Sequence, residues 1–363
     1  MQDVFSQVEE IVENITNLEK SKLTISEILR KLNEEVAVGP NQEIKDEKLI
    51  SAVEEKNANN FSITGIDGGI VKDSFHGLEL VLLRAVAVNF VYNNGSLKKV
   101  DYYPSSIPMP LPKTSFNSFS EFELSSWYNF ERQIVEITTA IESIENMKTE
   151  FLFLDGSVIP QYVTKPSNPV LKERYHLLIR KYKELFEISN EKLILAGIVE
   201  DSRSVKFCDI LTRRILSDDI AREVKIVLEK TNDSNLLYHL LKRGERTFVF
   251  NYSQHPEAHP LLKEFEEMKG NFYSFYIKTA DFDRPLRVDF VGEREQTNVA
   301  NKISEILMRT CGHSQYGLPS VLIEADQRAK LAQRDLDLFY LDLISRIGNV
   351  STLFKMRREM RPF

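Results

Sequence analysis

Two apolar segments that end in Asp-Gly are the feature that most limits how this chain can fold. The first, FSITGIDGG, begins at residue 61, and the second, FLFLDGS, begins at residue 151. Four consecutive apolar residues in the second segment indicate a strand that is buried on both faces. The later segment KLILAGIVED has the same character. Strands of this kind belong to a sheet that helices cover, so the sequence predicts an α/β fold.

The residues between these segments predict the order β, β, β, α, β, α, β. A long strand over 78–92, an Asn-Asn-Gly turn and a return strand over 98–103 have the pattern of a hairpin. Apolar residues at helical spacing predict one helix over 120–147 and another over 169–188. The Pro-rich segment PSSIPMPLP, between the hairpin and the first helix, is too broken for regular structure.

The chain is expected to have three parts. Residues 1–58 are a helical extension, and residues 59–346 form the α/β domain, whose mixed sheet is flanked by helices. An insertion around 207–292 gives this domain a C-terminal α/β elaboration, and residues 347–363 are a basic tail.

Outside the core, helical spacing makes three further predictions. Residues 4–37 are expected to form two helices separated by a break, and a short third helix is expected near 49–54. The N-terminal helices are a candidate arm for a partner or for dimer contacts, or a flap that packs on its own domain. Near the end of the chain, one helix is expected over 319–346.

The charge of the chain is concentrated at its N-terminus. The formal net charge is −7, which on its own argues against a nucleic-acid partner. Residues 1–58 contain 13 acidic and 7 basic residues, and residues 59–363 contain 41 acidic and 40 basic residues. The local balances are therefore −6 and −1. The net charge consequently does not exclude a body that binds DNA.

Composition excludes several classes of protein. Two distant cysteines, Cys208 and Cys311, are too few for a disulfide scaffold or a Cys-rich zinc site. The first residues, MQDVFSQVEEIVENI, lack the basic and apolar regions of a signal peptide. The longest apolar stretch contains Glu79, Arg84 and Asn89, which is too polar for a membrane span. A soluble, cytoplasmic protein with no membrane partner is expected.

Acidic residues at four places are candidates for one site. Asp67 and Asp155 each end a predicted strand, and neighbouring strands of an α/β sheet bring such side chains to one edge. The helix between them carries Glu131 near its buried stripe, with further glutamates along its length. Asp326 lies beside a small-residue face of the last predicted helix. This is the layout of a ribonuclease H-like nuclease, which has acids on the first strand, the following helix, the fourth strand and the last helix.

Crowded carboxylates have a definite chemistry. They repel one another when ionised, so they require divalent cations. Oxygen ligands without sulfur select Mg²⁺ or Mn²⁺ over zinc. Two such ions about 4 Å apart activate water and stabilise the leaving oxygen of a phosphodiester. The sequence therefore predicts two-metal phosphodiester hydrolysis.

Four segments carry a resemblance to a known family. From about residue 60 to 335, the chain resembles the NurA family of DNA-end-processing nucleases. Members of this family have a ribonuclease H-like core. The matching segments are GIDGG at 65–69, FLDGS at 153–157, GIVEDSRS at 197–204 and YGLPSVLIEADQRAKLA at 316–332.

This resemblance implies an activity and partners. It implies manganese-dependent single-strand endonuclease and 5′-to-3′ exonuclease activity on DNA. It also implies a homodimer that works with the hexameric HerA translocase in repair of double-strand breaks.

The resemblance also assigns residues. Asp67 and Asp155 match the strand aspartates of the family. Glu131 matches the helix glutamate, although Glu136 and Glu142 also fit by spacing. Asp326 stands where many relatives have histidine.

Basic and aromatic residues supply candidate DNA contacts. Arg203 and Lys206 follow the third buried strand, and we expect them to contact a phosphate, with Arg213 and Arg214 as further candidates. Tyr316 is a candidate for stacking on a base. The alternative for the cations is a solvated ion-pair network, and the alternative for the tyrosine is core packing.

Two other functions remain open. An ATPase or kinase-type phosphotransferase with a ribonuclease H-like core would use Gly-rich loops around phosphate, which GIDGG fits in part. A non-catalytic clamp would bind DNA or a translocase without cleaving.

Overall fold

The computed structural model describes residues 2–35, 39–54, 59–160, 165–348 and 350–356. The chain folds into two compact units, each built from three segments. The first unit comprises residues 1–58, 197–254 and 271–319, and the second comprises residues 59–196, 255–270 and 320–363. The predicted extension and most of the predicted insertion thus belong to the first unit. The predicted basic tail is described only as far as residue 356.

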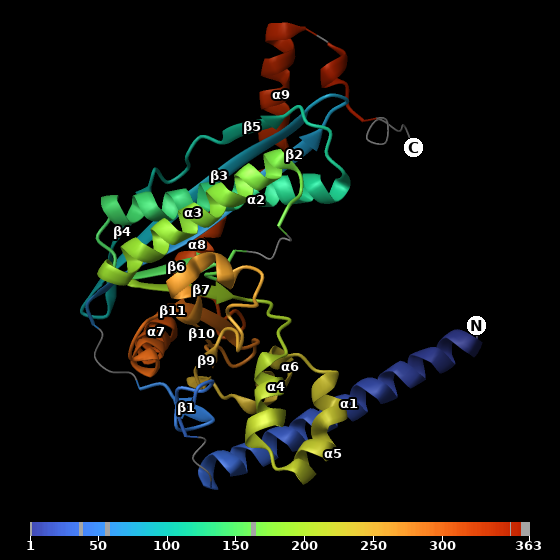
Figure 1. Ribbon diagram of the computed structural model, residues 1–363, viewed down its shortest axis with the longest axis vertical. Helices are drawn as coiled ribbons and strands as arrows, with labels where there is room; N and C mark the ends of the chain where they lie inside the picture. Colours follow the sequence, from blue (N-terminus) through green and yellow to red (C-terminus); the bar gives the residue numbers. More distant parts are fainter. Residues whose placement is uncertain (1, 36–38, 55–58, 161–164, 349, 357–363) are drawn as a thin grey trace. The chain divides into compact units, whose positions relative to one another are not determined.

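The sheet of the second unit has the strand order β6, β2, β3, β4 (Figure 1). Strand β6 runs parallel to β2, whereas β3 is antiparallel to both β2 and β4, and β5 pairs with the beginning of β3. The strands are β2 (Phe61–Ser74), β3 (Glu79–Asn93), β4 (Ser96–Tyr103), β5 (Leu111–Ser115) and β6 (Phe151–Asp155).

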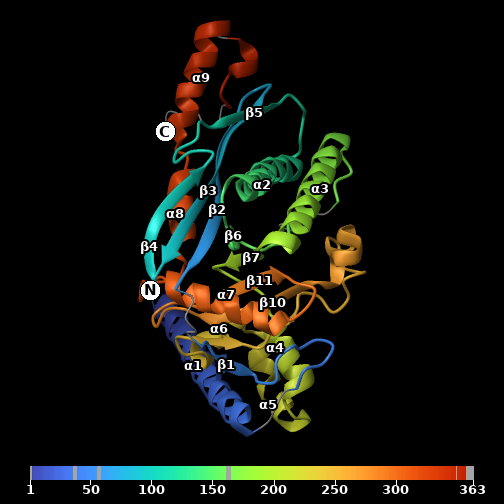
Figure 2. The same ribbon diagram turned by 90° about the vertical axis from the view of Figure 1, so that its left-hand side faces the viewer.

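Helices cover both faces of this sheet. Figure 2 shows α2 and α3 beside each other on one face of β2 and β3, with α8 on the opposite face. Helix α2 begins with a capping box in which Ser120 and Glu123 satisfy each other's backbone N–H groups. The helices are α2 (Glu121–Asn146), α3 (Pro169–Lys192), α8 (Ser320–Ala329) and α9 (Gln333–Ile347), with 3₁₀ segments at Leu262–Gly270 and Ser351–Leu353.

The first unit combines short strands with helices. Its strands have the order β1, β8, β10, β11, with β9 on β10, and β7 (Ile194–Val199) contains the boundary between the units. The strands are β1 (Ile50–Ala52), β8 (Glu245–Thr247), β9 (Phe250–Asn251), β10 (Phe272–Lys278) and β11 (Leu286–Val291). The helices are α1 (Gln2–Glu35), α4 (Lys206–Ile210), a π-helical turn (Leu211–Ile215), α5 (Asp218–Glu229), α6 (Asp233–Leu240) and α7 (Gln296–Thr310).

The predicted α/β fold is confirmed: a mixed sheet is flanked by helices, and the chain begins with a helix. Both cysteines are buried and form no disulfide. Within the described residues, no helix combines the length and apolar character needed to cross a membrane.

Several local predictions were wrong. Residues 4–37 contain one helix rather than two, because Ile25 and Leu29 continue its apolar stripe into the core of the first unit. The segment near 49–54 is a strand, β1, since it pairs with the distant β8. Part of the Pro-rich segment enters β5, and the last predicted helix is divided into α8 and α9.

Candidate active site

The central acid of the site, Asp67, lies within a strand and not at its end. Strand β2 continues to Ser74, which corrects the expectation that Asp-Gly-Gly terminates it. The parallel strand β6 stops at Asp155, and the last β2–β6 pair is Ile66 with Leu154. Asp67 and Asp155 therefore follow the same pair on two neighbouring strands, and their side chains share a hydrogen bond.

Glycines beside Asp67 allow helices to approach β2 closely. A Cβ atom at Gly69 would lie 2.1 Å from the carbonyl oxygen of Ala329 in α8, and one at Gly68 would lie 2.3 Å from Cγ of Glu136 in α2. Both distances are far below van der Waals contact. Glycine is thus required here for close approach, and the approach brings Glu136 to β2.

Three carboxylates line one small pocket. Asp67, Glu136 and Asp155 share a cavity of about 20 Å³ in the second unit. This volume is enough for one water or ion and no more. The remaining lining residues are Ile66, Ile137, Leu154, Ser157 and Tyr182.

Burial and crowding raise the pKa values of Asp67 and Glu136. Burial is the largest cause of the raised pKa of Asp67, and the charge of Asp326 on α8 adds to it. Burial also raises the pKa of Glu136 to about 8; the positive charge of Arg132 opposes this rise, and the charges of Asp67 and Asp155 add to it. Arg132 forms an ion pair with Glu136 one helical turn away. The pocket thus holds more negative groups than its own cation neutralises.

The structure brings Asp67 and Asp155 into contact, and the charge of Asp326 acts on Asp67, whereas Glu131 is paired with another residue. The Glu131 side chain is 3% exposed, and its Oε1 lies 2.8 Å from Nε of Arg174 on α3. Glu136 takes the expected place in the pocket. Glu142 accepts a hydrogen bond of 3.1 Å from the hydroxyl of Tyr103. The signal in the sequence was weak: Arg132 precedes Glu136 by four residues, the spacing of a helical ion pair.

The residues present fit a divalent metal ion by their chemistry. All donors are carboxylate oxygens, the ligands that Mg²⁺ and Mn²⁺ prefer. The surplus negative charge in a space of one ion is the condition that a bound cation relieves. Among the described residues, no group of three or more His, Cys, Asp or Glu side chains already converges on one point as a formed metal site would.

The predicted DNA contacts all lie in the first unit. Arg203 is exposed, and Tyr316 is 44% exposed. Lys206 is half-buried: its ammonium donates to the carbonyl oxygen of Tyr252 and lies 4.0 Å from the centre of that ring. Burial lowers the pKa of Lys206 to about 8.

The other two predicted cations are paired. Arg213 and Arg214 lie 3.2 and 3.7 Å from the carboxylate of Glu43. The ion-pair alternative therefore describes both arginines in the DNA-free chain.

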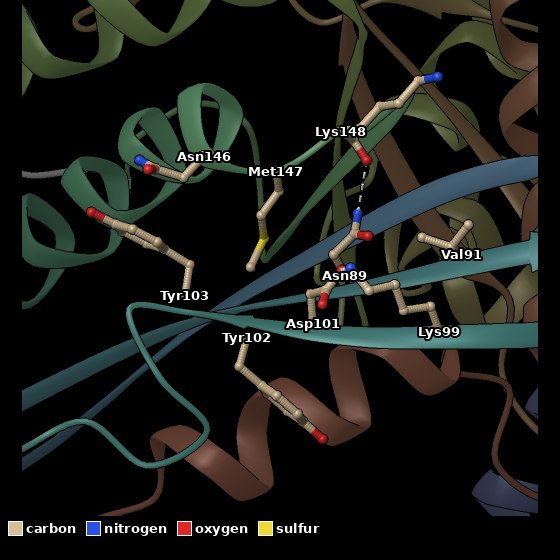
Figure 3. Close-up of a pocket in the computed structure, with 9 residues that line it drawn as sticks. All are labelled: Asn89, Val91, Lys99, Asp101, Tyr102, Tyr103, Asn146, Met147 and Lys148. Carbon is tan, nitrogen blue, oxygen red and sulfur yellow. Dashed lines mark hydrogen bonds and ion pairs between the residues drawn. The ribbon is translucent and has the colours of Figure 1, made fainter.

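A larger pocket of the second unit has a different chemistry. It has a volume of about 360 Å³ and lies before the start of β6, at the other end of that strand from Asp155 (Figure 3). Its acid, Asp101, is paired with Lys99 at 2.7 Å. Lys148 points away from the other labelled side chains, while its carbonyl oxygen accepts from Asn89. The pocket thus lacks a carboxylate cluster, so its size does not make it the catalytic candidate.

The fold and the carboxylate cluster define a ribonuclease H-like α/β protein with acids on a central strand, its parallel neighbour and the helices on both faces. A family profile described as "NurA domain" matches residues 61–331. The chain belongs to the NurA family. No curated protein matches the chain.

Solved structures agree with this assignment at the level of the fold. The NurA nuclease from Sulfolobus solfataricus has a TM-score of 0.59 and 13% identity, covering 96% of this chain and 98% of that one. A NurA bound to dAMP and manganese has a TM-score of 0.55 and 11% identity, covering 98% and 99%. A NurA with manganese has a TM-score of 0.54 and 10% identity, covering 94% and 99%.

Proposed function

We propose that this chain is a metal-dependent deoxyribonuclease that hydrolyses phosphodiester bonds. The observation that carries the proposal is the pocket in which Asp67, Glu136 and Asp155 meet. Membership of the NurA family supports it. Manganese and dAMP bound to a NurA of the same fold support the metal and the substrate class.

The chain's own residues have distinct tasks in this proposal. Asp67, Glu136 and Asp155 would hold Mn²⁺ or Mg²⁺, and Asp326, whose charge contributes to the raised pKa of Asp67, would serve a second ion. The bound ions supply an activated water and stabilise the leaving oxygen. The burial of Asp67 and Glu136 limits the water around them, which strengthens their hold on a cation.

The narrower proposals come from the family. We propose single-strand endonuclease and 5′-to-3′ exonuclease activity on DNA ends in double-strand break repair, in the cytoplasm. The proposed partners are a second copy of the chain and a HerA-type hexameric ATPase. Arg203, Lys206 and Tyr316 remain proposed DNA contacts; Arg213 and Arg214 would have to leave Glu43 to bind phosphate.

The packing of β2 speaks against the kinase-like alternative. The space beside Gly68 is occupied by the Glu136 side chain, and the space beside Gly69 by the backbone of α8. These glycines therefore do not form an open phosphate loop. The clamp alternative requires a site without working acids, whereas Asp67 and Asp155 are present and in contact.

The proposal is tested by incubating the protein with labelled single-stranded DNA in Mn²⁺, in Mg²⁺ and in EDTA, alongside Asp155→Ala. We expect cleavage with the metals and none with EDTA or the variant. Cleavage that survives EDTA or the substitution would refute metal-dependent hydrolysis. ATP turnover without DNA cleavage would support the kinase-like alternative, and DNA binding without either activity would support the clamp.

A further inference from the structure

Arg132 on α2 is a partly buried cation beside the acidic pocket. It forms an ion pair with Glu136 one helical turn later, in which its Nη1 donates to Oε1 of the carboxylate. The two side chains are 22% and 13% exposed, whereas those of Lys225 and Glu229, a pair with the same spacing, are 61% and 62% exposed. Water screens an exposed pair and weakens its charges. The charge of Arg132 therefore acts more strongly on its surroundings than that of a surface pair.

Three observations place this charge at the pocket. The Glu136 oxygen that accepts from Arg132 lies where a Cβ atom at Gly68 would be, and Gly68 follows the acid of β2. Burial raises the pKa of Asp67, and the positive charge of Arg132 opposes this rise. Burial also raises the pKa of Tyr182, which lines the pocket from α3; the charge of Glu136 adds to that rise, and the charge of Arg132 opposes it.

The charge of the pocket matches that of one divalent ion. When Asp67, Glu136 and Asp155 are ionised, they carry three negative charges, and Arg132 supplies one positive charge, so the balance is −2. The cavity that these acids line, about 20 Å³, has room for one ion. Without Arg132 the three acids would instead match the charge of a trivalent ion.

We propose that Arg132 determines the ionic charge for which the pocket is selective. This role rests on the proposed nuclease function, because it concerns the same metal site. A carboxylate accepts from several partners, so Glu136 can hold an ion and the guanidinium together. The guanidinium repels a cation in the pocket, and it repels a trivalent ion more than a divalent one, since the Coulomb energy is proportional to the charge of the ion. Arg132 thereby keeps the pocket selective for Mn²⁺ or Mg²⁺.

Calorimetric titration of Mn²⁺ and of Tb³⁺ into the full chain tests this role. Arg132→Gln keeps a donor for Glu136 and removes the charge. It should lower the Kd for Mn²⁺ about tenfold and the Kd for Tb³⁺ about 30-fold, because the same change in potential acts on two charges and on three. Arg132→Lys, which keeps the charge, should leave both Kd values within about threefold of the wild type.

Arg174→Gln is the matched control. Arg174 pairs with Glu131 of the same helix α2, at 2.8 Å, and Glu131 does not line the pocket. This variant should bind both ions as the wild type does. A variant with Asp67→Asn and Asp155→Asn measures the binding of Tb³⁺ to other carboxylates of the chain, which is subtracted.

Urea unfolding supplies a second readout. In EDTA, Arg132→Gln should be less stable than the wild type, because Glu136 loses its charged partner. In saturating Mn²⁺ this loss should shrink, since an ion that binds more tightly stabilises the folded state more. Arg174→Gln should lose the same stability under both conditions. A variant Arg132→Gln that folds only with Mn²⁺ would show the same effect in a stronger form.

The outcomes separate this role from the proposed function. Kd values of Arg132→Gln that equal or exceed those of the wild type, or equal gains for Mn²⁺ and Tb³⁺, would overturn the role of Arg132 alone. The same gains in Arg132→Lys would also overturn it, because the charge would then have no part in the effect. A wild type that binds neither ion would contradict the proposed function and this role with it.

Discussion

At the scale of single residues, the position of Glu136 on α2 decides which glutamate reaches the acids. Glu131 and Glu136 are five residues apart, so they point about 140° away from each other around the helix. One of them therefore faces Arg174 on α3, and the other faces Asp67 and Asp155.

Substitution of Glu136 separates this assignment from the alternatives on the same helix. Glu136→Gln should lower the rate of DNA cleavage by more than about 100-fold, because even residues outside the metal ligands cost 10–100-fold when removed. Glu142→Gln, which keeps an oxygen that can accept from the Tyr103 hydroxyl, should leave the rate within about twofold. Single-turnover cleavage of labelled DNA in Mn²⁺ measures both. Equal losses in the two variants would show that Glu136 has no special role.

The raised pKa of Glu136 predicts a pH dependence of stability in the metal-free chain. Its pKa is about 8 when folded and near 4.5 when unfolded. Between these values the folded state keeps a proton that the unfolded state has lost, so stability falls as pH rises from 4.5 to 8. Glu136→Gln should reduce this slope. Urea unfolding in EDTA at several pH values measures how the free energy of unfolding changes with pH in the wild type and in Glu136→Gln. The same pH dependence in both proteins would contradict the burial of this acid.

Asp67 and Asp155 could be predicted because Asp-Gly after an apolar strand is a local signal. The choice between Glu131 and Glu136 could not, because both border the apolar stripe of one helix. Only the packing of α3 and β2 on different sides of α2 separates them.

At the scale of elements, the glycines of β2 determine how closely α8 lies on the sheet. Gly69→Ala should destabilise the chain by about 1–3 kcal/mol, the usual effect of overpacking, since its Cβ would meet the backbone of Ala329. Gly270→Ala is the control, because nothing lies within 4 Å of its added Cβ. Thermal or urea unfolding compares the two. The close packing of α8 would be contradicted if Gly69→Ala were as stable as the wild type, or if only Gly270→Ala lost stability.

The elements of the core were predictable, and those that depend on distant partners were not. Strand β1 has three residues and is defined by pairing with β8, almost two hundred residues later. Strand β5 exists because the edge of β3 accepts it, despite the prolines nearby. The sequence pattern around each strand shows neither the pairing of β1 with β8 nor that of β5 with β3.

At the scale of the whole molecule, the proposed function requires a chain with net charge −7 to bind DNA, which is itself negatively charged. A divalent ion in the acidic pocket would neutralise the surplus negative charge there. We therefore expect single-stranded DNA to bind about tenfold more tightly in Ca²⁺, used as a probe of the same charge, than in EDTA at equal ionic strength. Fluorescence anisotropy measures the affinities, and Asp67→Asn should abolish the difference. Equal affinities in wild type would contradict a metal-assisted DNA contact.

The most direct measurement is calorimetric titration of Mn²⁺ into the metal-free chain and into a variant that carries Asp67→Asn and Asp155→Asn. The account predicts saturable binding to the wild type and none to the variant, whose folding is verified by circular dichroism. Binding that is equal in both proteins, or absent from both, would contradict the claim that these carboxylates form the metal centre of a nuclease.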